Sequence, residues 1–432
     1  MNTPPPDDTR DAESRRAEQL RRLREMLDAV LPTNPFYGAK MAVAGVTQGQ
    51  DVDSFDAYAR LPFTTKGELS EDQDEAPPYG TNLTYPSPQY VRMHQTSGTT
   101  GSPLRWLDTE ESWSWFGACW ADVFGAAGVD GSDRVFFPFS FGPFIGFWTA
   151  YEGARRIGAM ALPGGAMSSE QRVRAIVEHK ATVVVSTPTY ALRLAEVAAE
   201  AGVDLASSDV RVTIHAGEPG ASIPGTKRRI DEAWGATCFD HAGATEVGAW
   251  GFECEAHAGM HLNEAEFICE VIEPDTGDPA DEGELVLTNL GRLGMPVIRY
   301  RTGDHVRLAA GPCPCGRTYR RIQGGVIGRI DDALLVRGVV VFPSAVESIV
   351  RRFPAVGEFA IHAQRHGELD QLTVQIESEA AADSEATTDA VAAALREALG
   401  LRVSVESVAV GSLPRFDLKA RRVTDHRQQT HD

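Results

Sequence analysis

The middle of the chain alternates short apolar runs with helix-like segments, and this alternation limits the fold more than any other feature. Apolar runs at 134–137, 159–163 and 182–186 predict strands, and segments 148–157 and 169–179 between them predict helices. Strands that alternate with helices in this way favour a parallel sheet with crossover helices. The sequence therefore predicts an α/β fold with mixed and parallel sheets in a large N-terminal domain.

The pattern changes after Gly325, where a smaller unit begins. Strands are expected at 358–363, 371–376 and 403–410, with a helix at 386–399. This mixture predicts a separate α+β domain. We therefore expect an N-terminal domain of residues 1–328 and a C-terminal domain of residues 329–432.

The chain is acidic, with a formal net charge of −20. This balance opposes non-specific adhesion to nucleic acid and to anionic membranes, so neither is expected as a partner. The first thirty residues mix arginines with acids and lack an apolar core, which argues against a signal peptide and favours a cytoplasmic protein. The apolar stretch 135–150 contains Pro138, Gly142 and Pro143 and is too short to span a bilayer.

The sharpest local signal is the run Thr96-Ser97-Gly98-Thr99-Thr100-Gly101. Its glycines allow close approach of the backbone to an anion, and its hydroxyls and amides offer donors, so the run is a candidate phosphate loop. Ser102 stands where the lysine of a GTPase-type P-loop would follow, which excludes that class. Alone, such a run is more often an ordinary turn.

Four further motifs follow the candidate phosphate loop in order. They are Ala242-Gly243-Ala244-Thr245-Glu246, Tyr300-Arg301-Thr302-Gly303-Asp304, Gly328-Arg329-Ile330-Asp331-Asp332 and Pro414-Arg415-Phe416-Asp417-Leu418-Lys419. Singly, each is more often a turn or a solvated group of charges. In this order and spacing the set resembles the adenylate-forming superfamily of acyl-CoA synthetases, adenylation domains and luciferases.

A closer resemblance is to the phenylacetate-CoA ligase family with its coenzyme F390 synthetase-like relatives. It extends over nearly the whole chain, from about residue 34 to 427, and is carried by Leu61-Pro62-Phe63-Thr64-Thr65-Lys66, Ser186-Thr187-Pro188-Thr189-Tyr190-Ala191, Gly338-Val339-Val340-Val341-Phe342-Pro343-Ser344 and Lys419-Ala420-Arg421-Arg422-Val423. The resemblance implies ATP-dependent activation of a carboxylic acid. An acyl-adenylate would form with release of pyrophosphate, and the acyl group would pass to coenzyme A.

The resemblance also implies roles for single residues. The implied ATP and AMP contacts are Thr96, Ser97, Gly98, Thr99, Thr100, Gly101, Ala216, Gly217, Glu218, Pro219, Asp240, His241, Ala242, Asp304 and Arg329. The implied catalytic residues are Lys419, Glu246, Arg329 and Thr245. Glu246 would bind Mg²⁺ through a hard carboxylate oxygen. Lys419 would stabilise the negative charge of the transition state, carried in by a mobile C-terminal domain that turns about a hinge at Asp331.

Two positions depart from the family pattern. Ser102 replaces a lysine that often follows the phosphate loop, so phosphate binding relies more on backbone amides and Mg²⁺. Ala242, with His241 beside it, replaces an aromatic residue that commonly stacks on adenine. Adenine packing, or the neighbouring acyl pocket, must therefore differ from the usual arrangement.

An aromatic-rich run between Phe136 and Trp148 borders the acyl site in the family that the chain resembles. Aromatic runs are more often core than pocket, but ligand pockets are built from the same side chains. The expected acyl-pocket residues are Phe136, Phe141, His215, Ala242 and Gly243. Bulky side chains in this run favour a small aromatic acid over a long fatty acid.

Cys313-Pro314-Cys315, together with Cys254 and His261, can supply a four-ligand zinc site, with His257 as the competing fourth ligand. In this pattern the chain resembles the zinc-binding members of the family. A closed shell of three cysteines and one histidine leaves no open coordination position, so the zinc would be structural. The alternative is a free dithiol turn with solvated histidines.

Other functions remain open at this stage. The acyl group could be delivered to an amine, a carrier-protein thiol or another nucleophile instead of coenzyme A. A non-catalytic nucleotide-binding module would be indicated by loss of Glu246, Asp304 or Lys419, and all three are present. The family resemblance also makes a homodimer plausible.

Overall fold

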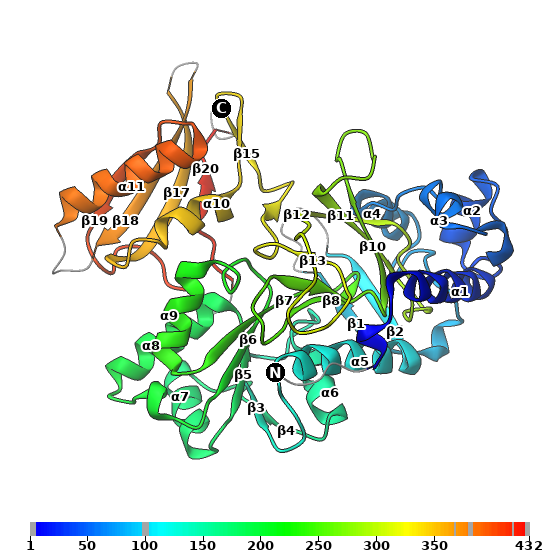
Figure 1. Cartoon of the computed structure of the whole chain (residues 1–432), viewed down its shortest axis with the longest axis horizontal. Coiled ribbons are helices and arrows are strands. Elements are labelled where there is room, and N and C mark those ends of the chain that lie inside the picture. Colours follow the sequence, from blue (N-terminus) through cyan, green and yellow to red (C-terminus); the bar gives the residue numbers. More distant parts are fainter. Residues whose placement is uncertain (1–5, 97–102, 367–368, 379–382, 417–418, 428–432) are drawn as a thin grey trace.

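The computed structural model describes residues 6–96, 103–366, 369–378, 383–416 and 419–427. Within these ranges the chain forms a large domain and a smaller C-terminal domain, as Figure 1 shows. The predicted α/β class with a small α+β C-terminal unit is confirmed. No helix among the described residues combines the length and the apolar character that a bilayer crossing requires.

The chain begins with a helical segment at one end of the large domain. Its helices are α1 (Ala12–Val30), α2 (Pro35–Val43), α3 (Phe55–Ala59) and α4 (Lys66–Glu75), with short 3₁₀ turns η1 (Pro6–Thr9), η2 (Gly49–Asp51) and η3 (Ser87–Gln89). Helix α1 begins after Asp11, whose carboxylate accepts the backbone N–H of Ser14 at 2.9 Å and so caps the first turn. Its Leu23, Leu27 and Val30 recur at helical spacing and are fully buried.

An eight-stranded sheet forms the centre of the large domain, in the order β13-β9-β8-β7-β6-β5-β3-β4. Strands β4, β3, β5, β6 and β7 are parallel, and β7, β8, β9 and β13 are antiparallel. The strands are β3 (Arg134–Phe137), β4 (Met160–Pro163), β5 (Val183–Ser186), β6 (Val212–His215), β7 (Thr237–Ala244), β8 (Gly248–Glu253), β9 (Met260–Leu262) and β13 (Arg321–Ile322).

Helices cover both faces of this sheet because its parallel strands are apolar on both sides. Helices α5 (Glu110–Ala126) and α6 (Trp148–Arg156) lie on the face to which Val135 and Phe137 point. The opposite face, with Phe136 and Val184, packs against α7 (Ser169–Glu178), α8 (Pro188–Glu200) and α9 (Pro224–Trp234), with η4 (Leu205–Ser207) nearby. The strands and helices predicted for 134–186 agree with these elements to within two residues at each end.

Two smaller sheets complete the large domain. One has the order β10-β11-β12-β14, with β10 (Phe267–Ile272), β11 (Glu282–Asn289), β12 (Tyr300–Arg307) and β14 (Gly328–Arg329). The other is the hairpin of β1 (Tyr90–Gln95) and β2 (Arg105–Thr109), and the candidate phosphate loop lies between its strands. Because β14 pairs with β12, the domain boundary predicted between residues 328 and 329 falls inside a strand of the large domain.

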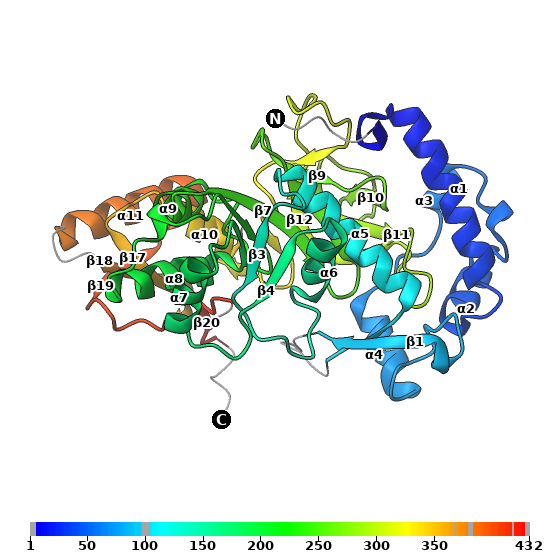
Figure 2. The ribbon, with the colours of Figure 1, turned by 90° about the horizontal axis from the view of Figure 1, so that it is seen from below.

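The C-terminal domain has its own sheet and its own core. The hairpin of β15 (Leu334–Val336) and β16 (Val339–Val341) leads into α10 (Pro343–Val350). A sheet of order β19-β18-β17-β20 then packs against α11 (Ser384–Leu399), with β17 (Val356–His366), β18 (Leu369–Ser378), β19 (Ser404–Val408) and β20 (Val423–Asp425). Figures 1 and 2 place this domain beside α8 and α9, at the opposite end of the molecule from α1 to α4.

Candidate active site

Loops at the carboxyl ends of the parallel strands carry part of the predicted site, as is usual for open α/β sheets. Strand β6 ends at His215, and the chain turns at Gly217 with φ of 95°, a left-handed conformation that favours glycine. The next residue, Glu218, accepts the backbone N–H of Thr189 at 2.9 Å and that of Ala420 at 2.7 Å. Burial raises the pKa of the Glu218 carboxyl. Glu218 therefore joins the large domain to the chain beside Lys419.

Lys419 of the C-terminal domain lies directly against Gly217. A Cβ added to Gly217 would stand 3.2 Å from Cε and 3.9 Å from Nζ of Lys419. Desolvation by neighbouring protein atoms lowers the pKa of Lys419, although the residue as a whole is exposed to solvent. Glu218, Glu246 and Asp304 oppose this decrease in the pKa, and Arg329 adds to it. The ammonium group thus lies within electrostatic reach of all four side chains.

Asp304 and Arg329 face each other across paired strands β12 and β14, with 3.6 Å between Arg329 Nη1 and Asp304 Oδ1. Burial raises the pKa of Asp304 to about 7, and the charge of Glu246 adds to this effect while Arg329 opposes it. Asp331 accepts two hydrogen bonds from Arg329, at 2.9 and 3.0 Å. The predicted hinge residue therefore also holds the predicted catalytic arginine.

The candidate phosphate loop lies largely outside the described residues, which exclude Ser97, Gly98, Thr99, Thr100, Gly101 and Ser102. Thr96 is described at the base of the loop. Its Oγ1 accepts the backbone N–H of Leu104 at 3.0 Å, and its own N–H donates to the carbonyl of Leu104 at 2.9 Å. The two ends of the loop are thus held together at the end of the β1-β2 hairpin.

The residues predicted to line adenine come from the loop after β6, residues 216–219, and from β7, residues 240–243, where Asp240 and His241 are buried. Burial raises the pKa of Asp240 to about 7, and its carboxylate accepts the hydroxyl of Ser222. His241 points toward α5, where its ring centroid lies 4.2 Å from that of Trp120 and its Nδ1 contacts the carbonyl of Gly251 at 2.6 Å. Burial lowers the pKa of His241 to about 4, so its ring is neutral.

The structure brings only part of the predicted acyl pocket together. Phe141 is half-buried, with its ring 4.6 Å from that of Phe139 and 4.5 Å from that of Trp148. The expectation that Phe136 lines the acyl pocket is not met, because Phe136 is fully buried in the core beneath α7 and α8. His215 is also fully buried, with Nδ1 3.3 Å from Ser186 Oγ. Ala242 is half-buried and Gly243 is exposed on β7, next to the Thr245-Glu246 turn.

A buried ion pair that the sequence analysis missed supports this turn. Arg292 and Asp108 are fully buried and share two hydrogen bonds of 2.8 Å. Arg292 Nη1 also donates to the carbonyls of Thr245, at 2.8 Å, and Glu246, at 3.1 Å. The pair therefore connects β2, which follows the phosphate loop, to the backbone that carries Glu246. The signal available in the sequence was the position of Arg292 within the largely apolar segment 285–300, which indicates a buried arginine that needs a partner.

We expect replacement of Asp108 by asparagine both to lower stability and to weaken the binding of magnesium. Loss of the carboxylate leaves the Arg292 charge buried with a poorer partner, at a cost of about 3–5 kcal/mol. The released Thr245-Glu246 turn should then raise the Mg²⁺ concentration for half-maximal adenylation several-fold. Glu270→Gln is the matched control. Glu270 forms an ion pair with the largely buried Arg299, with 2.7 Å between the paired atoms, and neither residue contacts the Thr245-Glu246 turn through this pair. Equal Mg²⁺ dependence in the two variants would contradict this role.

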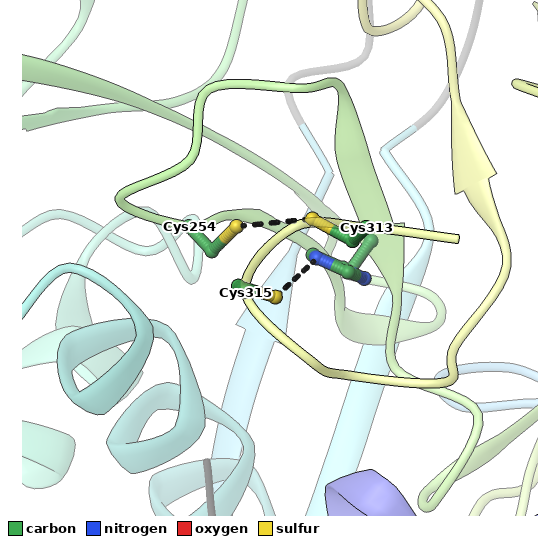
Figure 3. A group of neighbouring side chains, drawn as sticks. Cys254, Cys313 and Cys315 are labelled. Carbon is green, nitrogen blue, oxygen red and sulfur yellow. Dashed lines mark hydrogen bonds between the residues drawn. The ribbon is translucent and has the colours of Figure 1, made fainter. Parts of the chain in front are cut away.

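The four predicted zinc ligands meet in one buried cluster. The ligand atoms of Cys254, His261, Cys313 and Cys315 all lie within 4.8 Å of one another. In Figure 3 the sulfur atom of Cys254 faces that of Cys313. These two Sγ atoms are 3.7 Å apart, and Cys315 Sγ lies 3.5 Å from His261 Nε2. Burial lowers the pKa of His261 to about 3, so its imidazole is in the neutral form that binds metals. His257, the alternative ligand, instead contacts Glu253 at 3.0 Å through Nδ1.

This cluster has the donor set, the burial and the spacing that a structural zinc ion requires. The backbone N–H of Arg317 also donates to Cys315 Sγ, at 3.4 Å. Such a donor favours the thiolate over the thiol. The residues present therefore fit zinc.

In this two-domain α/β fold, Lys419 of the C-terminal domain lies against the loop after β6 of the large domain. This arrangement is the one expected of an adenylate-forming enzyme. Residues 338–427 match the family model of the C-terminal domain of AMP-binding enzymes. The chain is 31% identical to the phenylacetate-coenzyme A ligase of Pseudomonas putida, with coverage of 98% of this chain and 96% of the relative. For the ligase of Thermus thermophilus the identity is 31%, and the coverage is 96% and 97%. The chain belongs to the phenylacetate-CoA ligase family of ATP-dependent, AMP-forming acid-CoA ligases.

A solved relative has been captured in more than one state. The chain matches 2-hydroxyisobutyryl-CoA ligase in its postadenylation state with 2-HIB-AMP, at a TM-score of 0.92 and 30% identity, covering 99% of this chain and 94% of that one. In the thioesterification state, with 2-HIB-AMP and CoA, the TM-score is 0.73 at 32% identity and the same coverage. The domains of this chain are thus arranged more like those of the postadenylation state.

Proposed function

We propose that this ligase activates a small carboxylic acid, most suitably an aromatic one, and that Lys419 catalyses the adenylation step. The single observation that carries the proposal is the position of Lys419 against Gly217, within reach of Glu246, Asp304 and Arg329. A cation placed there can neutralise charge that develops between an acid carboxylate and the α-phosphate of ATP. The match to CoA ligases over nearly the whole chain supports coenzyme A as the acceptor.

The surrounding residues have complementary roles in this proposal. Asp304 would accept hydrogen bonds from the ribose hydroxyls, and Arg329 would hold the phosphate from the neighbouring strand β14. Glu246 would hold Mg²⁺, which when bound neutralises charge on the phosphates. Thr96, Thr245, Ala216, Pro219, Asp240 and Ala242 would complete the nucleotide site. The described part of the phosphate loop, Thr96, is compatible with this arrangement.

The two half-reactions require different positions of the small domain. Lys419 fills the space in front of Gly217, where the thiol of coenzyme A would later have to approach the acyl carbonyl. Asp331 is the proposed hinge, because it follows the last strand of the large domain and precedes the first hairpin of the small one. A rotation there would also change its ion pair with Arg329. Hinges are few positions that absorb a large change of backbone angle.

The aromatic cluster of Phe139, Phe141 and Trp148 supports an aromatic substrate, since rings favour the edge-to-face contacts that such a cluster offers. The curated relatives are phenylacetate-coenzyme A ligases, whereas the solved relative binds 2-HIB-AMP. An acid screen distinguishes these substrate classes. Phenylacetate, benzoate, 2-hydroxyisobutyrate and octanoate would each be supplied with MgATP, and pyrophosphate release would be measured with coenzyme A or hydroxylamine as trap. Highest turnover with octanoate would contradict the proposed small acyl pocket.

A structural zinc ion held by Cys254, His261, Cys313 and Cys315 is part of this proposal, and it places the chain in a zinc-binding branch of the family. It would fix the segment after β8 to the loop that precedes β13. A cytoplasmic location remains a prediction of the sequence analysis, and a homodimer remains a prediction from the family resemblance.

A further inference from the structure

Gly225 is the second residue of α9 and lies directly against Arg351 of the C-terminal domain. A Cβ added there would stand 2.7 Å from the carbonyl carbon of Arg351, 3.0 Å from its Cβ, and closer still to its carbonyl oxygen. Atoms do not pack at such distances, and the crowded atoms include backbone, which cannot rotate away as the end of a side chain can. The absence of a side chain at Gly225 is therefore required for this contact between the two domains.

Arg351 itself is held firmly within the C-terminal domain. It caps α10, and its side chain is only 2% exposed. Its Nη1 donates to the carbonyl of Gly357 at 2.7 Å, and its guanidinium lies 5.0 Å from the ring centroid of Phe359. A local shift of the Arg351 backbone would disturb this packing. A side chain at position 225 would therefore push away the C-terminal domain as a unit.

Helix α9 and the loop after β6 make two further contacts with the C-terminal domain. Arg229, one helical turn after Gly225, donates to the carbonyl of Gly357 at 3.3 Å. Glu218 accepts the N–H of Ala420 at 2.7 Å, directly beside Lys419. A displacement at Gly225 would therefore be transmitted along the interface to the place where Lys419 meets Gly217.

We propose that Gly225 is a positioning residue for adenylation, because its bare α-carbon lets the C-terminal domain dock closely enough for Lys419 to reach the nucleotide site. This inference rests on the proposed function of Lys419. Coenzyme A transfer, which needs Lys419 withdrawn, does not need the contact between Gly225 and Arg351. Substitution of Gly225 should therefore separate the two half-reactions.

Gly225→Ala separates two effects: alanine should stabilise helix α9 locally, whereas its Cβ should disturb the contact between the domains. The backbone of Gly225 is not in the left-handed region, and alanine is a better helix former than glycine. The fold of the large domain should therefore not suffer. Gly125→Ala in α5 is the matched control, because a Cβ at Gly125 meets no atom within 4 Å.

Three measurements on the full-length protein test the proposal: acid-dependent exchange of pyrophosphate into ATP, thioester formation from synthetic acyl-adenylate with coenzyme A, and thermal unfolding. For Gly225→Ala we expect at least a tenfold loss of exchange, thioester formation within twofold of the wild type, and no decrease in the unfolding midpoint. Gly125→Ala should match the wild type in all three. Unchanged exchange, or equal loss in both half-reactions, would overturn the proposal. Absence of exchange in the wild type would instead refute the proposed function.

Discussion

Replacement of Lys419 by alanine should reduce acyl-adenylate formation by about 10²- to 10³-fold, the loss usually seen when one preorganised electrostatic contact to a transition state is removed. The reason is the position of the ammonium group, which lies beside Gly217 and within reach of Glu246, Asp304 and Arg329. Two anionic reactants, a carboxylate and a phosphate, must approach each other there. Without the cation their repulsion is uncompensated, while the positioning by other residues remains.

Thioester formation from synthetic acyl-adenylate should stay within a few-fold of the wild type, because Lys419 must leave the site before the thiol enters. Arg421→Ala is the matched control, since Arg421 is a cation on the same segment with an exposed side chain. It should change neither half-reaction by more than about twofold, as is usual for surface substitutions. Equal damage to both half-reactions by Lys419→Ala would show that the lysine acts in neither step specifically.

The second large effect should follow loss of the zinc cluster. We expect Cys313→Ser to abolish stoichiometric zinc binding and to lower the unfolding midpoint by roughly 5 °C, as a loss of about 3–5 kcal/mol would in a domain of this size. The loop after Cys315 also holds the N-terminal segment, because Arg317 and Tyr319 both bind the carboxylate of Asp8, at 2.7 and 2.9 Å. Loosening of this loop should therefore expose the residues before α1 to proteolysis.

Metal analysis and calorimetry of three proteins decide this prediction. Cys269→Ser is the matched control, since Cys269 is buried in the same core but lies outside the ligand cluster. It should retain zinc and lose only about 1 kcal/mol, the usual scale for a polar atom introduced into a core. If wild-type protein contains no zinc and both variants unfold at the same temperature, the cluster is a set of free thiols.

The fold was predictable where the apolar periodicity of a segment and its length indicated the same element. The run at 134–137 forms β3, because its length suits a strand and not a helix. The helix expected at 386–399 forms the greater part of α11, because its apolar residues recur at helical spacing. The predicted zinc ligands also meet in space. They could be predicted because closely spaced cysteines in a loop are typical of metal sites. Motif order was sufficient to indicate the family.

Other features depend on contacts that no local pattern contains. Phe136 was expected at the acyl pocket, but alternation along a strand does not tell which face meets the ligand, and this ring lies beneath α7 and α8. The pair of Arg292 and Asp108 joins residues 184 positions apart and could not be derived from spacing. The close approach of Gly225 to Arg351 likewise depends on how two domains meet.

The central claim is that this chain forms an acyl-adenylate, and the most direct measurement is the fate of ATP in a single reaction mixture. Purified protein would be given ATP labelled in the α- and γ-phosphates, Mg²⁺, coenzyme A and the best acid from the screen. The account predicts AMP and pyrophosphate in equal amounts, with both strictly dependent on the acid and matched by thioester. Formation of ADP and inorganic phosphate with the same acid would contradict it.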